Sequence, residues 1–289
     1  MFEASRDKMK FPLVTTDWLA RNLSKKNLVI LDASMTKIVG REPIVYDSPV
    51  FIPNSMKLDL EHAFCDLQSS MVHAFPGEEK FTLEARKLGI NSGSIVVIYD
   101  NQGIYSSPRA WWIFQAMGHK NTYVLDGGLP QWCSENRKTV PHLSQAHSES
   151  GNIKGVFHAD KVCDSRYLLR RMADNQVAIL DARSAERFTG AVPEPREGVR
   201  SGHIPGSVNL PFSYVLEQHR FKSPEQLKTV FSQLLAEDKP AVFSCGSGIT
   251  ACIILLASVI AGYKNNVLYD GSWADWGSND SLPIASPQP

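Results

Sequence analysis

The chain has 289 residues, of which 43% are hydrophobic and 21% are charged, as in ordinary globular proteins. Its 30 Lys and Arg residues balance its 30 Asp and Glu residues. This balance excludes an overall positive charge that would attract nucleic acid or anionic membranes. Any recognition of an anion must therefore be local.

The N-terminal ten residues contain no apolar stretch of the kind found in secretory signals. They mix basic and acidic side chains, which does not match a mitochondrial presequence. The five cysteines form no Cys-x-x-Cys pair and no metal-ligand spacing, and their odd number favours a reducing compartment. We expect a cytoplasmic protein, with a mitochondrial location as the alternative, and we expect no metal.

The chain repeats itself after about 145 to 150 residues. Four blocks recur in the same order, and such a pattern indicates a duplicated domain. The paired blocks are residues 28–34 with 177–183, 51–58 with 203–210, 95–100 with 241–245, and 123–128 with 267–272.

Each half alternates short apolar β-type runs with helical stretches, such as the one from Ser223 to Ala236. This alternation predicts an α/β fold in which a mostly parallel sheet is flanked by helices on both faces. We place the first domain at residues 11–138, a linker at 139–155 and the second domain at 156–285. The linker histidines, His142 and His147, are interpreted as solvated side chains rather than metal ligands.

The second half contains a β-type run, residues 241–244, that ends at Cys245 and is followed by a Gly-rich turn and a long apolar segment. Unpaired N–H groups at the start of a helix favour an anion and so favour a thiolate. Gly246 and Gly248 allow successive amides to turn toward the sulfur and form a nest. Cys245 is thus a candidate nucleophile, although the residue types alone equally allow a buried structural cysteine. The matching position of the first half is Asp100, which cannot carry sulfur.

The segment from Cys245 to Thr250 reads Cys-Gly-Ser-Gly-Ile-Thr and resembles the active-site loop of the tandem rhodanese-like sulfurtransferases, in their 3-mercaptopyruvate branch. Thiosulfate-specific members usually carry an Arg-Lys pair where this chain has Gly246 and Ser247. Cdc25-like phosphatases need a longer loop closed by an arginine, which is missing here. The resemblance extends over nearly the whole chain and implies two tandem rhodanese-like domains, the first catalytically inactive. Further matching blocks are residues 107–112, 193–196, 202–206 and 269–277.

Two arginines, Arg187 and Arg196, match the substrate-binding pair of the family. Their planar guanidinium groups suit a carboxylate and a neighbouring keto oxygen. Without the resemblance, each would be interpreted as a surface residue. The resemblance also implies that loop amides stabilise the sulfur anion; those assigned to substrate binding belong to Gly246, Gly248, Ile249 and Thr250.

Ser247 and His73 match family residues that pass a proton near the nucleophile. The resemblance implies a third, acidic member, which we assign to Glu61, with Asp59 as the alternative. By residue type alone, a histidine before a Pro-Gly turn is usually structural. His203, Cys252 and the tryptophans Trp111, Trp112, Trp273 and Trp276 are interpreted as packing residues.

The implied activity is that of a 3-mercaptopyruvate sulfurtransferase. The donor's sulfur passes to Cys245 as a persulfide, pyruvate leaves, and a thiol such as thioredoxin, another thiol or cyanide then takes the sulfur, with hydrogen sulfide as a product. No Rossmann or P-loop motif occurs, and we expect no organic cofactor. The alternatives are a thiosulfate:cyanide sulfurtransferase and a non-catalytic persulfide or redox-sensing module.

Overall fold

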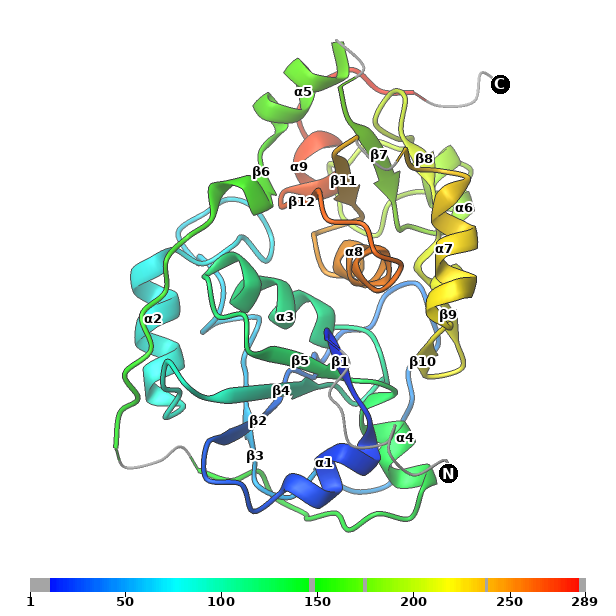
Figure 1. Ribbon diagram of the computed structural model, residues 1–289. Coiled ribbons are helices and arrows are strands. Elements are labelled where there is room, and N and C mark those ends of the chain that lie inside the picture. Colours follow the sequence, from blue (N-terminus) through cyan, green and yellow to red (C-terminus); the bar gives the residue numbers. More distant parts are fainter. Residues whose placement is uncertain (1–10, 146–148, 174–175, 237–238, 286–289) are drawn as a thin grey trace. The chain divides into compact units, whose positions relative to one another are not determined.

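The computed structural model describes residues 11–145, 149–173, 176–236 and 239–285 (Figure 1). The linker residue His147 lies outside this part. The chain forms two compact units, and each contains segments from both halves of the sequence. The first unit comprises Met1–Cys65, Pro76–Phe157 and Gln218–Phe221, and the second comprises Asp66–Phe75, His158–Glu217 and Lys222–Pro289.

The first unit is built on a five-stranded parallel sheet in the order β1-β5-β4-β2-β3. Its central strand, β4, is buried along its whole length, as expected for a strand covered on both faces. The strands are β1 (Leu13–Val14), β2 (Leu28–Asp32), β3 (Ser55–Lys57), β4 (Ile95–Tyr99) and β5 (Thr122–Leu125).

Helices cover this sheet from both sides. One core cluster joins Trp18 and Trp132 to sheet residues such as Val97, while a separate helix packs on β4 and β5. The helices are α1 (Thr16–Asn22), α2 (Glu78–Lys87), α3 (Ser107–Ala116) and α4 (Gly128–Ser134), of which α3 is the one on β4 and β5. The short strand β10 (Arg220–Phe221) lies outside the five-stranded sheet.

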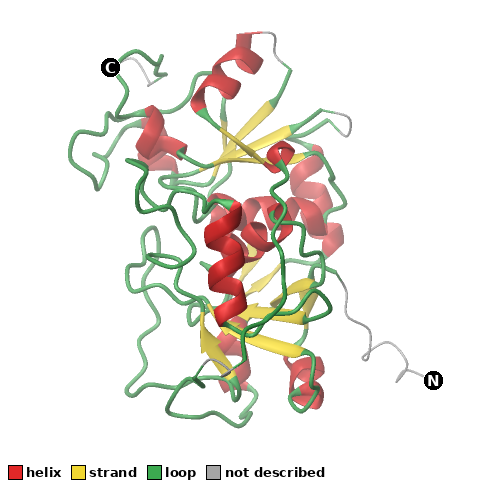
Figure 2. Cartoon of the chain, turned by 90° about the vertical axis from the view of Figure 1, so that its left-hand side faces the viewer, coloured by secondary structure: helices red, strands yellow, loops and turns green. Residues whose placement is uncertain are grey.

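The second unit repeats this plan with the sheet order β6-β12-β11-β7-β8, again with parallel pairs. Figure 2 shows the strands in yellow and the helices in red. Register pairs of β11 with both neighbours place Phe243 beside Leu180 and Leu268 at the centre of the sheet. The strands are β6 (Val162–Cys163), β7 (Ala178–Asp181), β8 (Val208–Asn209), β11 (Ala241–Ser244) and β12 (Asn266–Tyr269), with β9 (Leu216–Glu217) outside the sheet.

The helices of the second unit include α8, which packs on β11 and β12 and is buried from Ala251 to Ser258. The α-helices are α5 (Ser165–Ala173), α6 (Ala185–Thr189), α7 (Pro224–Ser232), α8 (Ala251–Ile260) and α9 (Ser272–Trp276), and the 3-10 helices are η1 (Ala159–Lys161) and η2 (Phe212–Val215). Within the described ranges, no helix is long and apolar enough to cross a membrane.

The two sheets confirm the duplication, because the repeated blocks form equivalent strands: β2 and β7, β3 and β8, β4 and β11, and β5 and β12. One expectation differs at a helix end. Helix α7 starts with a capping box at Ser223 but ends at Ser232 rather than near Ala236. The N–H groups of Leu234 and Leu235 both bond to the carbonyl of Phe231, which tightens the chain into a turn.

Candidate active site

Cys245 follows the last residue of β11 and is almost completely buried. The N–H of Gly248 donates a hydrogen bond to its Sγ at 3.1 Å. Gly248 has a φ of 78°, a left-handed conformation that suits glycine, so the loop can curl back onto the sulfur. The residues between Cys245 and α8 therefore form a tight loop around the thiol, at the carboxyl end of the central strand, where ligands bind in such sheets.

Ser272 anchors the backbone of Cys245, the candidate nucleophile. Its Oγ accepts the N–H of Cys245 at 3.1 Å and donates to the carbonyl of Tyr269 at 3.0 Å. The next residue, Trp273, donates its N–H to the Cys245 carbonyl at 2.9 Å. Ser272 has a φ of 51°, an uncommon value for a residue with a side chain. Sequence reasoning did not single out this serine, although its match to Gly128 in the repeat was the available signal.

His73 and Ser247 lie together within the second unit. The Nδ1 atom of His73 is 3.2 Å from Ser247 Oγ, although the two residues are 174 positions apart in the sequence. His73 belongs to the segment Asp66–Phe75, which comes from the first half of the chain but groups with the second unit. The N–H of Phe75 donates to Asp270 Oδ2 at 2.7 Å and ties this segment to the residue just after β12.

Arg187 lies beside Gly246, the residue that follows Cys245. A Cβ built on Gly246 would lie 3.0 Å from Arg187 Nη2 and 3.7 Å from Nη1. Arg187 Nε and Nη2 donate to the Glu194 carboxylate at 3.2 and 2.5 Å. The structure thus brings this predicted arginine to the Cys245 loop, and it adds Glu194 as a partner that sequence reasoning did not identify.

A second arginine, Arg183, also binds Glu194, the partner of Arg187. It donates through Nε to both carboxylate oxygens of Asp181, through Nη2 to Asp181 Oδ2, and through Nη1 to Glu194 at 2.8 Å. Its guanidinium lies 4.5 Å above the Trp273 ring. Burial alone would lower the pKa of Arg183, but Asp181 and Glu194 outweigh this effect and raise the pKa. Arg183 is thus a permanent buried cation.

Arg196 lines a cavity of about 470 Å³ in the second unit. The cavity also contacts Val72, next to His73, and Ala274, whose N–H donates to the Gly246 carbonyl at 2.9 Å. Ile249 is buried behind the loop, and Thr250 precedes α8 without a side-chain cap.

The carboxylates assigned to the relay belong to the first unit. Glu61 accepts a hydrogen bond from Thr36 Oγ1 at 3.3 Å, and Asp59 Oδ2 pairs with His62 Nδ1 at 3.0 Å. Burial would raise the pKa of Asp59, but hydrogen bonds from the Glu61 N–H and from His62 lower it. The acidic member of the relay stays a prediction.

In the equivalent loop of the first unit, the backbone N–H groups bind the side chain of an aspartate in the same loop. Asp100, which stands where Cys245 stands in the repeat, is fully buried. Its carboxylate accepts backbone N–H groups of Gln102, Tyr105, Ser106 and Ser107 at 2.9 to 3.0 Å, and the Ser107 hydroxyl at 2.7 Å. The Asp100 carboxylate therefore takes up the loop amides that form the nest, and the loop has no cysteine to act as a nucleophile.

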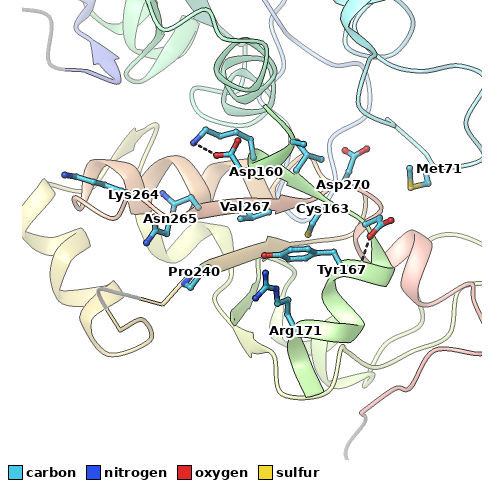
Figure 3. Close-up of a pocket in the computed structure, with 15 residues that line it drawn as sticks. Met71, Asp160, Cys163, Tyr167, Arg171, Pro240, Lys264, Asn265, Val267 and Asp270 are labelled. Atoms are coloured by element: carbon cyan, nitrogen blue, oxygen red, sulfur yellow. Dashed lines mark hydrogen bonds and ion pairs between the residues drawn. The ribbon is translucent and has the colours of Figure 1, made fainter. Parts of the chain in front are cut away.

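The other thiols are poor rivals to Cys245. Cys163 lines a separate cavity of about 700 Å³ with Tyr167 and Arg171 (Figure 3). Burial, and then the charges of Asp164 and Asp270, raise the pKa of Cys163 well above its ordinary value, so its thiolate is disfavoured. Cys252 is buried and donates to the Gly248 carbonyl at 3.3 Å, and all five cysteines are free.

The remaining motif residues are structural. His203 stacks on Phe188, with ring centroids 3.9 Å apart, and its Nδ1 lies 2.9 Å from the Phe188 carbonyl oxygen. Trp111, Trp112, Trp273 and Trp276 are all buried, consistent with packing roles.

Comparison with known proteins identifies the family. A model of the rhodanese-like domain matches residues 15–135 and 164–279. The chain is 37% identical to a mouse 3-mercaptopyruvate sulfurtransferase, over 91% of each chain. It is 36% identical to the Arabidopsis thaliana mitochondrial thiosulfate/3-mercaptopyruvate sulfurtransferase 1, over 95% of this chain and 78% of the relative. A crystal structure of the Escherichia coli 3-mercaptopyruvate enzyme superposes with a TM-score of 0.79 at 31% identity, covering 91% of this chain and 99% of that one. With two parallel sheets of the same order, one cysteine loop and one carboxylate-filled loop, the chain belongs to the rhodanese-like family and is a tandem-domain sulfurtransferase.

Proposed function

We propose that this sulfurtransferase takes its sulfur from 3-mercaptopyruvate and carries it on Cys245 as a persulfide. The observation that carries the proposal is the position of Arg187 against Gly246, directly after the nucleophile. A guanidinium there can bind the carboxylate of the donor, whereas Gly246 and Ser247 in the loop supply no cation of their own for a dianion such as thiosulfate. Arg196 is the second member of the proposed clamp.

In the first half-reaction, the Cys245 thiolate attacks the donor's sulfur. The sulfur–sulfur bond forms as the carbon–sulfur bond breaks, and pyruvate leaves as its enolate. Ser247 and His73 pass the proton that converts the enolate into pyruvate. The amides of residues 246–250 stabilise the sulfur anion, as the Gly248 N–H does for the thiol.

In the second half-reaction, an acceptor attacks the outer sulfur of the persulfide and restores the Cys245 thiolate. Acceptors of suitable chemistry are thiols, including reduced thioredoxin, and cyanide. When a dithiol or a second thiol reduces the transferred sulfur, hydrogen sulfide is the product. This corresponds to the activity of a 3-mercaptopyruvate sulfurtransferase, EC class 2.8.1.2, in the cytoplasm or the mitochondrion.

The test is steady-state pyruvate release from 3-mercaptopyruvate with reduced thioredoxin, measured beside thiosulfate plus cyanide on the same preparation. We expect a strong preference for 3-mercaptopyruvate, and Cys245→Ser should abolish turnover while the protein stays folded. A preference for thiosulfate would show that the proposed donor is wrong. Thiosulfate is the alternative to test because the name of the Arabidopsis relative includes both donors. Stoichiometric labelling of Cys245 without turnover of either donor would instead favour a redox-sensing module.

A further inference from the structure

We propose that Glu194 is a positioning residue for the donor site. Its carboxylate holds the Arg187 guanidinium with one N–H edge directed at the loop after Cys245. The proposal rests on the function proposed for Arg187, and it assigns to Glu194 a role in geometry rather than in charge neutralisation.

The first argument is the use of the guanidinium's donors. Arg187 donates the N–H of Nε and one N–H of Nη2 to the two oxygens of Glu194. A guanidinium carries five N–H donors in a rigid plane. The edge formed by Nη1 and the second N–H of Nη2 is therefore the edge left for a second carboxylate.

The second argument is the place of that edge. Apart from Gly246 itself and its two chain neighbours, the heavy atoms nearest to the Cβ position of Gly246 are Arg187 Nη2 at 3.0 Å and Nη1 at 3.7 Å. The free edge consequently lies against the residue that follows the nucleophile. A donor carboxylate bound there would place its own sulfur near Cys245, which is the geometry that proximity effects require.

The third argument is the rigidity of Glu194. Its side chain is 4% exposed, and its Oε1 also accepts Arg183 Nη1 at 2.8 Å. Arg183 is fixed in turn by Asp181 and by the Trp273 ring. The side chain of Arg187 is 15% exposed. Among these ion-paired residues, it is therefore the one that can rotate toward solvent.

Two roles for Glu194 predict opposite results. If the carboxylate positions Arg187, its removal leaves two like-charged guanidinium groups side by side, and Arg187 turns away from the loop. If the carboxylate only neutralises Arg187, its removal strengthens the attraction for an anion. A shorter acid at the same position separates the roles further, because it keeps the charge and loses the reach.

The experiment compares alkylation of Cys245 by iodoacetate and iodoacetamide, which have similar size but differ in charge. The readout is the ratio of the two rate constants, measured at the Cys245 peptide by mass spectrometry. Glu194→Gln and Glu194→Asp should both lower the iodoacetate preference at least about tenfold, toward the value for Arg187→Ala. Glu186→Gln removes an exposed carboxylate beside Arg187 on α6, so it is the control and should leave the ratio unchanged.

The kinetic readout is the KM for 3-mercaptopyruvate, which should rise more than kcat falls in both Glu194 variants, because a clamp binds substrate as well as transition state. Thermal unfolding of each variant verifies that it is folded, and Glu194→Asp keeps the proposal testable if Glu194→Gln does not fold. An unchanged or increased ratio in the Glu194 variants would overturn the positioning role. If Arg187→Ala also leaves the ratio unchanged, the clamp itself fails; if the ratios behave as expected but thiosulfate is the better donor, only the proposed donor fails.

Discussion

Arg187 Nη2 lies 3.0 Å from the point that a Cβ would occupy on Gly246. A side chain at residue 246 would crowd the Arg187 guanidinium. The absence of a side chain there therefore lets the guanidinium approach Cys245. The residue type at position 246 thus limits, by steric exclusion, where the proposed donor-binding residue Arg187 can lie.

Gly246→Ala should displace Arg187 and reduce kcat/KM for 3-mercaptopyruvate about tenfold, with little change in the free energy of unfolding. Steady-state pyruvate release measures the effect. Gly93→Ala is the control, because a Cβ at residue 93 would meet no atom within 4 Å. Equal effects of the two substitutions would show that Gly246 does not hold space for Arg187.

Ser272→Gly should separate backbone strain from anchoring of the nucleophile. Glycine relieves a φ of 51°, worth about 1 kcal/mol, but it leaves the buried Cys245 N–H without its acceptor, at a cost of about 1 to 3 kcal/mol. We expect a small net loss of stability and a roughly tenfold slower formation of the persulfide, measured in a single turnover. Ser278→Gly, at an exposed position, is the comparison, and full activity of Ser272→Gly would contradict the anchoring role.

Asp100→Cys should not create a second nucleophile. The substitution removes an acceptor that satisfies four backbone N–H groups and one hydroxyl, all buried. We expect the free energy of unfolding to fall by at least about 3 kcal/mol, measured by chemical denaturation. Asp280→Asn, whose side chain is 96% exposed, should cost almost nothing. New sulfurtransfer at residue 100 would overturn the view that this nest is purely structural.

His73→Gln should lower kcat about 100-fold or more while the KM for 3-mercaptopyruvate changes little, because the proposed relay acts on the departing enolate. Ser247→Ala should give a similar loss, and the double variant should lose no more than either single one, since the two side chains lie 3.2 Å apart. His142→Gln, in the exposed linker, controls for loss of a histidine. Additive losses would show that the two residues act separately.

The buried His119 should make stability depend on pH. Burial lowers its pKa, although a contact with the Ser94 carbonyl, 3.1 Å from Nε2, partly opposes this effect. A lowered folded-state pKa means that the unfolded chain binds the proton first as the pH falls. The free energy of unfolding should therefore be greatest above the ordinary histidine pKa of about 6.5 and decrease below it.

This pH effect can be measured by chemical denaturation at about pH 7.5 and about pH 5. His119→Gln should show a smaller loss between the two conditions than the native chain, whereas His142→Gln should behave as the native chain does. An identical loss in all three proteins would assign the acid sensitivity to other groups.

The sequence was sufficient to predict the duplicated α/β fold, because repeated apolar runs fix buried strands and their order recurs in both halves. It also predicted that Cys245 ends a strand, since Gly-rich turns mark such borders. The pairing of His73 with Ser247 depended on the family resemblance, because nothing local in the sequence indicates a contact over 174 positions.

Other parts of the site could not be predicted from pattern. Glu194 stands in a Pro-Glu-Pro stretch that looks like an exposed loop, yet its carboxylate is buried between two arginines. For Ser272 the repeat offered only its match to Gly128, and nothing in the pattern indicated a bond to Cys245, 27 positions away. Both depend on tertiary contacts that pair residues from separate elements.

The compact unit that contains Cys245 also includes residues 66–75, which lie in the first half of the sequence. Deletion of the first half would remove the Phe75 N–H that donates to Asp270 and the His73 ring that contacts Ser247. The second half alone therefore lacks part of the unit that contains Cys245. The boundary between the two repeats in the sequence is thus not the boundary between the two compact units.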